Sequence, residues 1–243
     1  MTAELRRLWQ EAFGDSEETL DAFFATGFSE DRFHYILDKG VPVSALYWFD
    51  CCLGGYKLAY LYAVATAKSH RGRGLARRLI EETHSILKAQ GYAGAILVPG
   101  TAELFGYYEK MGYRKVTQIR EFTCGQGQTS VLLREIDAKE YADLRKQYLP
   151  AGGVVQEGSA LSFLQTYTKF YEGRDFLLAA GEDNGVLIAR ELLGNAHAAP
   201  AILCALGFAE GRFRTPETGR AFAMFLPLEQ ACPTPAYFGL ALD

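Results

Sequence analysis

The sequence lacks a long apolar run, a paired-cysteine motif and a large excess of charge, and each absence excludes a class of protein. No hydrophobic stretch among the 243 residues approaches the ~20 residues that a membrane-spanning helix needs. The formal net charge of -4 leaves no basic field that would attract nucleic acid. We therefore expect no membrane partner and no nucleic-acid partner.

Cysteine and histidine are also too sparse to build a covalent or metal framework. The five cysteines are an odd number and contain no C-x-x-C pair, which favours reduced thiols over a disulfide framework. The four histidines show no ligand spacing, so we predict no metal site. The first residues lack the uninterrupted apolar stretch of a signal peptide. Together these features predict a cytoplasmic protein, and none of them indicates an oligomeric state.

The sequence does contain alternating strand and helix patterns, and 49% of its residues are apolar. In the first half, three strands separated by short turns predict an antiparallel meander. The expected elements are strands at 32–38, 41–49 and 56–66, a helix from Leu75 to Gly91, a strand at 94–100, a helix at 101–112 and a strand at 113–122. This order predicts the α/β class (α+β type), with a mixed, mostly antiparallel sheet flanked by helices.

A change in composition around Cys124 predicts a boundary between two domains, residues 1–124 and 125–243. The second half is expected to contain a strand at 130–136, helices at 138–149 and 159–171, a hairpin at 175–193, a helix at 196–206 and strands at 220–228 and 236–242. Hairpin, helix and strand repeat the first half in outline, which predicts a second, smaller α/β lobe, a degenerate repeat of the first. It contains no second cluster of arginine and glycine, so we expect one ligand site.

That cluster is the string SHRGRGLARRLIEE, residues 69–82, which places four arginines at the start of a helix. Helix N-termini carry partial positive charge and normally favour Asp and Glu. The arginines are either solvated surface charges or partners of an anionic ligand. The interleaved Gly72 and Gly74 favour the ligand, because glycine reaches the positive φ angles of an anion-binding loop. We predict a phosphate held by backbone amides and by the helix dipole.

Two common phosphate-binding patterns are absent. The chain has no G-x-x-x-x-G-K-[ST] string, and Arg77 stands where a dinucleotide fingerprint needs its third glycine. The string RGRGLA instead matches [QR]-x-x-G-x-[GA] and resembles the pyrophosphate loop of the GNAT superfamily of N-acetyltransferases. Further on, LFGYYEKMGYRK resembles a second GNAT signature. The resemblance covers about half of the chain. The loop is also similar to that of the enhanced-intracellular-survival group, a multi-lobed bacterial arrangement.

The resemblance implies an acetyl-CoA donor and a small-molecule or peptide acceptor whose primary amine attacks the thioester directly. By the same resemblance, the backbone of Ala63, Val64 and Ala65 would bind the pantetheine arm, and Tyr108 would protonate the departing thiolate as a general acid. The pyrophosphate would bind the amides of Arg71, Gly72, Arg73, Gly74, Leu75 and Ala76.

Several assignments stay open at this stage. The base that deprotonates the amine could be His34, His70, Glu103 or the C-terminal carboxylate of Asp243. Either Asp15 or Ser16 is expected to cap a short helix. The tyrosine stripe at positions 56, 60 and 62 is expected to serve packing. The alternative to an enzyme is a non-catalytic acyl-CoA-binding sensor or interaction module, because one fold hosts many functions.

Overall fold

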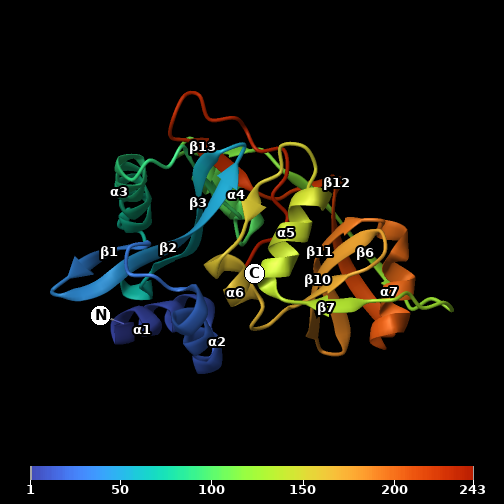
Figure 1. The fold of residues 1–243 in the computed structure, drawn as a ribbon. Coiled ribbons are helices and arrows are strands. Elements are labelled where there is room, and N and C mark those ends of the chain that lie inside the picture. The colour runs from blue at the N-terminus through green and yellow to red at the C-terminus, as the bar shows by residue number, and fades with distance from the viewer. Residues whose placement is uncertain (1, 243) are drawn as a thin grey trace.

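The computed structural model describes residues 2–242, which form two lobes that each contain one β-sheet (Figure 1). The predicted mixed α/β class is confirmed. The elements of the first lobe are α1 (Thr2–Phe13), α2 (Glu17–Ala22), a π-helical turn (Phe23–Gly27), β1 (Phe33–Asp38), β2 (Val41–Leu53), β3 (Tyr56–Thr66), a 3-10 turn (Lys68–His70), α3 (Leu75–Ala89), β4 (Gly94–Leu97), α4 (Ala102–Glu109) and β5 (Arg114–Lys115). None of the described helices is both long and apolar enough to cross a membrane.

The second lobe follows without a long linker. Its elements and the strands that return to the first sheet are β6 (Gln118–Gly125), β7 (Arg134–Ile136), α5 (Ala138–Tyr148), β8 (Val155–Gln156), α6 (Ser159–Leu164), β9 (Lys169–Glu172), β10 (Phe176–Asp183), β11 (Val186–Gly194), a 3-10 turn (Ala196–Ala198), α7 (Ala199–Leu206), β12 (Glu210–Ala221) and β13 (Met224–Pro227). The second sheet has the order β6-β12-β11-β10-β9-β7.

The first sheet draws strands from both halves of the chain. Its order is β1-β2-β3-β4-β13-β5, and β8 pairs with β2. Thus β13, from the end of the chain, lies between β4 and β5 and pairs antiparallel with both. The chain leaves the first sheet after Lys115 and enters the second at Gln118. The expected domain boundary after Cys124 lies inside β6 and stays a prediction.

The second lobe repeats the order of the first around its parallel strand pair. β10 and β11 form an antiparallel hairpin, α7 follows, and β12 pairs in parallel with β11. β2, β3, α3 and β4 have the same arrangement in the first lobe. The N-terminus of α7 differs from that of α3, because Pro200 removes one of the amides that an anion would need. The expectation of a single ligand site stays a prediction.

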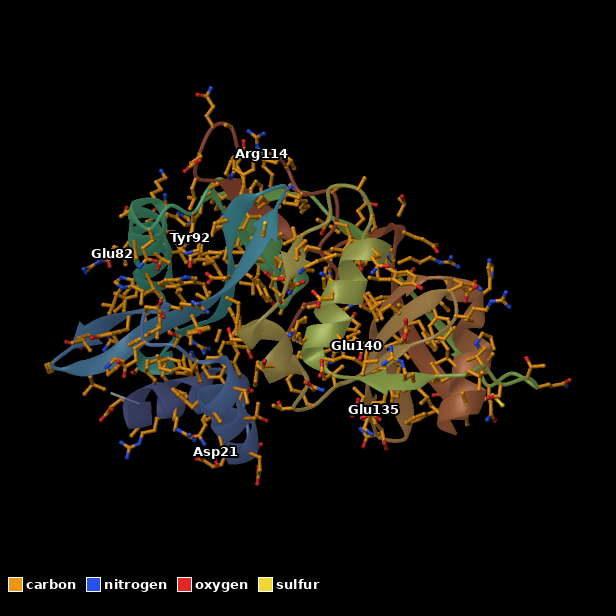
Figure 2. All side chains as sticks on the ribbon, viewed as in Figure 1. Asp21, Glu82, Tyr92, Arg114, Glu135 and Glu140 are labelled. Carbon is orange, nitrogen blue, oxygen red and sulfur yellow. The ribbon has the colours of Figure 1, made fainter. Side chains whose placement is uncertain are left out.

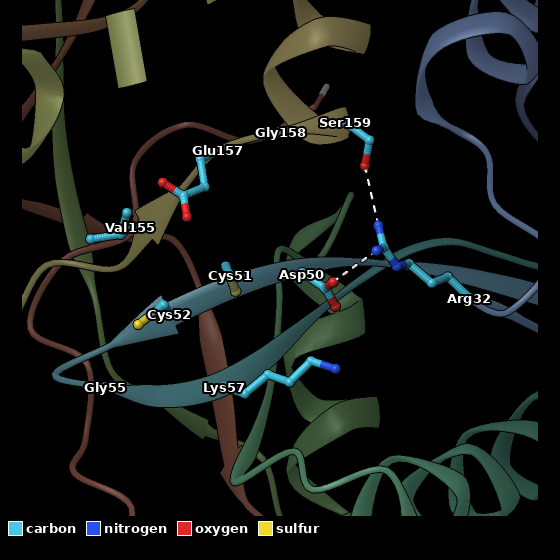
Figure 3. Close-up of a pocket in the computed structure, with 10 residues that line it drawn as sticks. All are labelled: Arg32, Asp50, Cys51, Cys52, Gly55, Lys57, Val155, Glu157, Gly158 and Ser159. Atoms are coloured by element: carbon cyan, nitrogen blue, oxygen red, sulfur yellow. Dashed lines mark hydrogen bonds and ion pairs between the residues drawn. The ribbon is translucent and has the colours of Figure 1, made fainter. Parts of the chain in front are cut away.

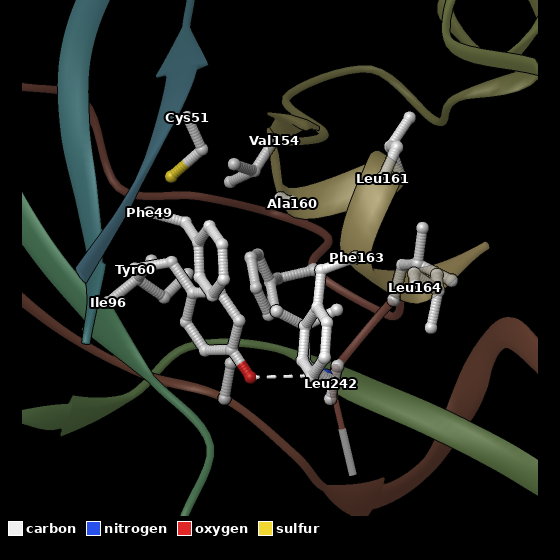
Figure 4. Close-up of a cluster of buried hydrophobic side chains, with 14 of the residues drawn as sticks. Phe49, Cys51, Tyr60, Ile96, Val154, Ala160, Leu161, Phe163, Leu164 and Leu242 are labelled. Atoms are coloured by element: carbon white, nitrogen blue, oxygen red, sulfur yellow. Dashed lines mark hydrogen bonds between the residues drawn. The ribbon is translucent and has the colours of Figure 1, made fainter. Parts of the chain in front are cut away.

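A hydrophobic core runs through both lobes and joins them. Figure 4 shows Phe49 and Tyr60 of the first sheet packed near Phe163 and Leu164 of α6. The last described residues lie between the lobes (Figure 1), and the backbone N–H of Leu242 donates to the Tyr60 hydroxyl at 3.3 Å. The C-terminal segment is therefore part of the core that holds the two lobes together.

A buried ion pair lies beside this core. Arg145 of α5 donates from Nε and Nη2 to both carboxylate oxygens of Glu191 on β11, at 2.7 and 2.9 Å. The hydroxyls of Tyr141 and Tyr237 donate to the same carboxylate, each at 2.9 Å. Burial alone would raise the pKa of Glu191, but the charge of Arg145 and these hydrogen bonds keep it below its usual value. Tyr237 ties the C-terminal segment to the second sheet through this group.

Three sequence-based expectations in the second half are wrong. The strand expected at 220–228 is divided between the two sheets, because residues 220–221 end β12 and residues 224–227 form β13. The helix expected at 159–171 ends at Leu164, and residues 169–172 instead form β9, because they pair with β10 and β7. The strand expected at 236–242 is an irregular segment with a single bridge between Gly153 and Tyr237. The latter two segments are apolar enough for either structure, so their neighbours in space decide the outcome.

The stability of the protein should fall in mild acid because of His84 on α3. Its ring lies 2.7 Å from the Tyr113 hydroxyl, and burial lowers the pKa of His84 from 6.5 to about 4. Between pH 6.5 and pH 4, His84 is therefore protonated in the unfolded chain and neutral in the folded protein. We expect about 2 kcal/mol to be lost between pH 6.5 and 4. In urea unfolding across this range, the free energy of unfolding should depend less on pH in His84→Gln than in the parent.

The control for this experiment is His197→Gln, because the His197 side chain is exposed. This variant should keep the parent's dependence of unfolding free energy on pH. A His84→Gln profile that is parallel to the parent's would contradict the assignment.

Candidate active site

A cleft opens where β3 and β4 separate. The two strands pair in parallel for only three residue pairs, and the last pair is Tyr60 with Ile96. β4 ends one residue later, shortly before Pro99, whereas β3 continues to Thr66. Beyond Tyr60, β3 therefore borders a cleft of about 460 Å³ on the side that β4 occupied. An elongated ligand could bind the exposed backbone of β3 along this edge.

A β-bulge on β3 shapes the middle of this cleft. Ala63 and Val64 together face the single residue Leu46 of β2, and both line the cleft. Ala63 has a φ of 51°, which is uncommon for a residue other than glycine. The indole Nε1 of Trp9 donates to the Ala63 carbonyl at 3.0 Å. This hydrogen bond from α1 holds the bulge, which redirects the backbone groups of β3 at the cleft.

The loop that follows β3 has the geometry of an anion cradle. Gly72 and Gly74 have φ values of 76° and 75°, and no atom lies within 4 Å of where either Cβ would stand. Gly74 is the N-cap of α3 and supplies no side-chain hydrogen bond, so the first amides of α3 are open to a ligand. Open space, positive φ and free helix amides fit a diphosphate group.

The four arginines of this region are exposed at the start of α3 and are positioned by local contacts. Arg71 donates to the Thr66 carbonyl at 3.1 Å, and Arg73 donates to the Ser69 carbonyl at 3.1 Å. Arg77 and Arg78 pair with Glu81 and Glu82 one helical turn later, at 2.8 and 2.7 Å. Figure 2 shows Glu82 on the outer side of the molecule. The loop arginines thus keep their charge beside the cradle, because carbonyl partners do not neutralise them.

Tyr108 of α4 lines the same cleft. Its side chain is 8% exposed and packs against Tyr107 and Tyr113. The hydroxyl forms no hydrogen bond with residues 2–242, so it is available to a ligand in the cleft. Burial raises the pKa of Tyr108 to about 12. The phenol therefore stays protonated across the neutral pH range and can donate a proton.

Of the site residues expected from sequence, Ala63, Val64 and Tyr108 line the cleft, residues 71–76 form the glycine loop after β3, and none of the described candidate bases lines the cleft. His34 pairs with Glu82 at 3.1 Å and His70 pairs with Asp38 at 3.0 Å, and neither lines the cleft. Glu103 is exposed outside the cleft. Asp243 lies outside the described residues. Ala65 follows the bulge on β3 and is buried rather than part of the cleft wall.

Asp15 is a cleft residue that the sequence analysis considered only as a helix cap. The cap of α2 is Ser16, whose side chain accepts a hydrogen bond from the Thr19 N–H. Asp15 instead lines the cleft, half-buried, and burial raises the pKa of its carboxyl. Tyr60 and Tyr62 also line the cleft, although their stripe was expected to serve packing alone. The positions of Asp15, Tyr60 and Tyr62 in the cleft wall depend on tertiary contacts, so the local sequence does not reveal them.

A second cavity, of about 520 Å³, lies at the other end of the β2–β3 hairpin (Figure 3). Its charged side chains already have partners within the protein. Arg32 pairs with Asp50 at 3.0 Å, and Glu157 pairs with Lys146 at 2.9 Å. Lys57 lies over the Tyr92 ring at 3.9 Å. This cavity is remote along β3 from the glycine loop and lacks its open amides, so we assign the chemistry to the cleft.

Comparison with known proteins agrees with this geometry. Residues 2–116 match the family model of the acetyltransferase (GNAT) domain. A GCN5-related N-acetyltransferase from Kribbella flavida has the same fold, with a TM-score of 0.68 and 18% identity over 92% of this chain and 67% of that chain. A GCN5-related N-acetyltransferase from Anabaena variabilis has a TM-score of 0.72 and 16% identity, over 93% of this chain and 70% of that chain. Eis1 from Mycobacterium abscessus has a TM-score of 0.68 and 13% identity, over 94% of this chain and 72% of that chain.

No significant match was found among curated protein sequences. The diverging strands, the glycine loop and the family match define an acyltransferase, a class that joins an acyl-CoA donor to an acceptor. Residues 2–116 belong to the GNAT superfamily of acetyltransferases, whose domain model they match.

Proposed function

We propose that the protein transfers an acetyl group from acetyl-CoA to a primary amine of a small molecule or peptide. The observation that carries this proposal is a cleft with a bulged strand edge and a protonated phenol in its wall, together with an anion cradle in the loop that follows the same strand. These features provide groups for the diphosphate, the pantetheine arm and the thioester of acetyl-CoA.

Each part of the cleft has a proposed role in this reaction. The amides from Arg71 to Ala76 bind the diphosphate, and the guanidinium groups of Arg71 and Arg73 add attraction. The backbone of Ala63 and Val64, which line the cleft, binds the pantetheine arm and orients the thioester, whereas the buried Ala65 has no role in this proposal. The acceptor ammonium first loses a proton to solvent, and the neutral nitrogen forms a bond to the acyl carbon. The bond from carbon to sulfur breaks, the sulfur takes a proton from Tyr108, and the second proton that the nitrogen releases restores the Tyr108 phenol.

The high pKa of Tyr108 is compatible with this step. A thiolate that leaves in a desolvated cleft is also more basic than in water, because burial disfavours its charge. Proton transfer from the phenol to the sulfur is therefore better matched than the unperturbed pKa values suggest. The same burial keeps Tyr108 protonated and ready for each turnover.

Tyr108→Phe tests the proposed function. We expect kcat for acetylation of a responsive amine to fall about 100-fold, because a positioned general acid contributes at least this much. The affinity for coenzyme A, measured by calorimetry, should stay within about twofold of the parent's, because the hydroxyl has no partner among residues 2–242. The control is Tyr107→Phe, the adjacent tyrosine, which does not line the cleft and should retain the parent's kcat.

The outcome also separates an enzyme from a sensor. If the parent binds acetyl-CoA tightly but acetylates no member of a broad amine panel, the chain is a non-catalytic acyl-CoA-binding module. If neither acetyl-CoA nor coenzyme A binds, the cradle itself is wrongly assigned.

A further inference from the structure

The first sheet has a hydrophobic core on each face, and the cleft is lined by residues of both cores. This division separates the donor half of the cleft from the acceptor half. Tyr108 and Leu61 belong to the core under α3 and α4, on the face that carries the glycine loop. Tyr60, Phe222 and Leu242 belong to the other core, which contacts α1 and the second lobe. All five line one continuous cleft. A donor that enters from the α3 side therefore meets its acceptor on the side of α1 and the second lobe.

This acceptor side contains one unpaired charge among its described residues. Only Asp15 and Arg220 are charged there. The guanidinium of Arg220 donates from Nε and Nη2 to both oxygens of Glu121, at 2.6 and 2.8 Å, which neutralises it. Asp15 forms no hydrogen bond or ion pair with residues 2–242. A carboxylate in a largely apolar setting without a partner is costly, and a cation from a ligand would offset that cost.

The surroundings of Asp15 are aromatic and close to the bulge. Asp15 also borders a small adjoining cavity lined by Trp9, Phe23, Tyr62 and Ala63. Ala63 and Tyr62 line both this cavity and the main cleft, so Asp15 lies beside the strand edge where the thioester is proposed to sit. Phe13, which is 50% exposed, stands at the same wall. Aromatic faces bind both apolar groups and cations.

We infer that the acceptor is a monoamine with an apolar, preferably aromatic, body, and that Asp15 binds its ammonium group beside the bulge. This inference rests on the proposed function, because it names the acceptor of that reaction. Polyamines fit this surface poorly, because Asp15 is the one carboxylate among the described lining residues and each further ammonium group would be desolvated without a partner of opposite charge. Asp15 thus selects for a positive charge, and the aromatic wall selects for the group attached to it.

The test compares phenethylamine with spermidine as acceptors. The parent should have a kcat/KM for phenethylamine at least about tenfold above that for spermidine. Asp15→Asn should raise the KM for phenethylamine on the order of 30-fold, because a charge-assisted hydrogen bond is lost, with a much smaller change in kcat. The control is Asp21→Asn, an exposed carboxylate on α2 (Figure 2) that pairs with Arg6 and does not line the cleft.

A binding measurement keeps this inference separate from the proposed function. Calorimetry with phenethylamine and the protein saturated with coenzyme A involves no turnover. Binding that weakens in Asp15→Asn but not in Asp21→Asn supports the inference even if the parent shows no acetylation. Undetectable phenethylamine binding to the parent, equal affinity in Asp15→Asn, or a preference for spermidine overturns it.

Discussion

Arg145→Met is expected to lower the free energy of unfolding by about 3–5 kcal/mol, the largest loss of stability that we predict. The substitution leaves the Glu191 carboxylate buried without its cation, and two tyrosine hydroxyls cannot replace a full charge. Arg145 also donates to the Val154 carbonyl at 3.0 Å, so the segment that leads into β8 loses a hydrogen bond. Urea unfolding followed by circular dichroism measures the effect.

Two further variants distinguish the buried charge from general loss of an arginine. Arg134→Met removes an exposed arginine that pairs with Glu140 and Glu172, and its unfolding midpoint should stay near the parent's because water screens such pairs. In the double variant Arg145→Met with Glu191→Gln, part of the lost stability should return, since no uncompensated charge remains. Equal losses in Arg145→Met and Arg134→Met would contradict the interpretation.

Arg145→Met should also loosen one wall of the cleft. Tyr237 donates to Glu191, and the chain continues from there to Leu242, whose N–H is bound by Tyr60 (Figure 4). Between them, Gln156 donates to the Leu240 carbonyl at 2.8 Å. Loss of the ion pair therefore loosens a segment that supplies Ala241 and Leu242 to the cleft wall.

Gly74→Glu should reduce affinity for coenzyme A on the order of 1000-fold. The new side chain would start at the N-cap of α3, where free amides are proposed to bind the diphosphate, and its carboxylate would repel that group. Because no atom lies within 4 Å of the Cβ position, the protein should still fold, apart from the strain of a φ of 75°. Calorimetry with coenzyme A provides the measurement.

Gly91→Glu is the matched control for this experiment. Gly91 has a φ of 77°, also has open space at its Cβ position, and lies just beyond the other end of α3. Both variants introduce similar backbone strain and the same charge, and Gly91→Glu should be the less stable of the two because the dipole of α3 disfavours a carboxylate at that end. Only Gly74→Glu should lose coenzyme A. Retained binding in Gly74→Glu would remove the loop from the proposed site.

Features of the cleft that depend on local conformation could be predicted from the sequence. The spacing of Gly72 and Gly74 before an amphipathic helix specifies positive φ angles and open amides, because both follow from the absence of a Cβ. The periodicity of α3 and the position of Tyr108 on a short helix are likewise local. The GNAT resemblance, which is confirmed for residues 2–116, rested on the local sequences RGRGLA and LFGYYEKMGYRK.

Features that depend on distant segments could not be predicted in this way. Asp15 and Ser16 are equally suited to cap a helix, and only the packing of α1 and α2 against β3 leaves Asp15 in the cleft. The bulge at Ala63 depends on Trp9, which is 54 residues away in the chain. Residues 236–242 read as a strand but pack between the lobes, because hydrogen bonds from both lobes hold their backbone.

By itself, the sequence determined the anion loop, the helix behind it and the class of fold, because glycine conformation, capping and periodicity act within a few residues. Only the tertiary structure decided that β13 lies between β4 and β5, that Ala241 and Leu242 help to form the cleft and that Asp15 faces the cleft without a partner among residues 2–242. The reason is physical: strand pairing and burial depend on which distant segments meet, and several apolar segments of this chain could have met.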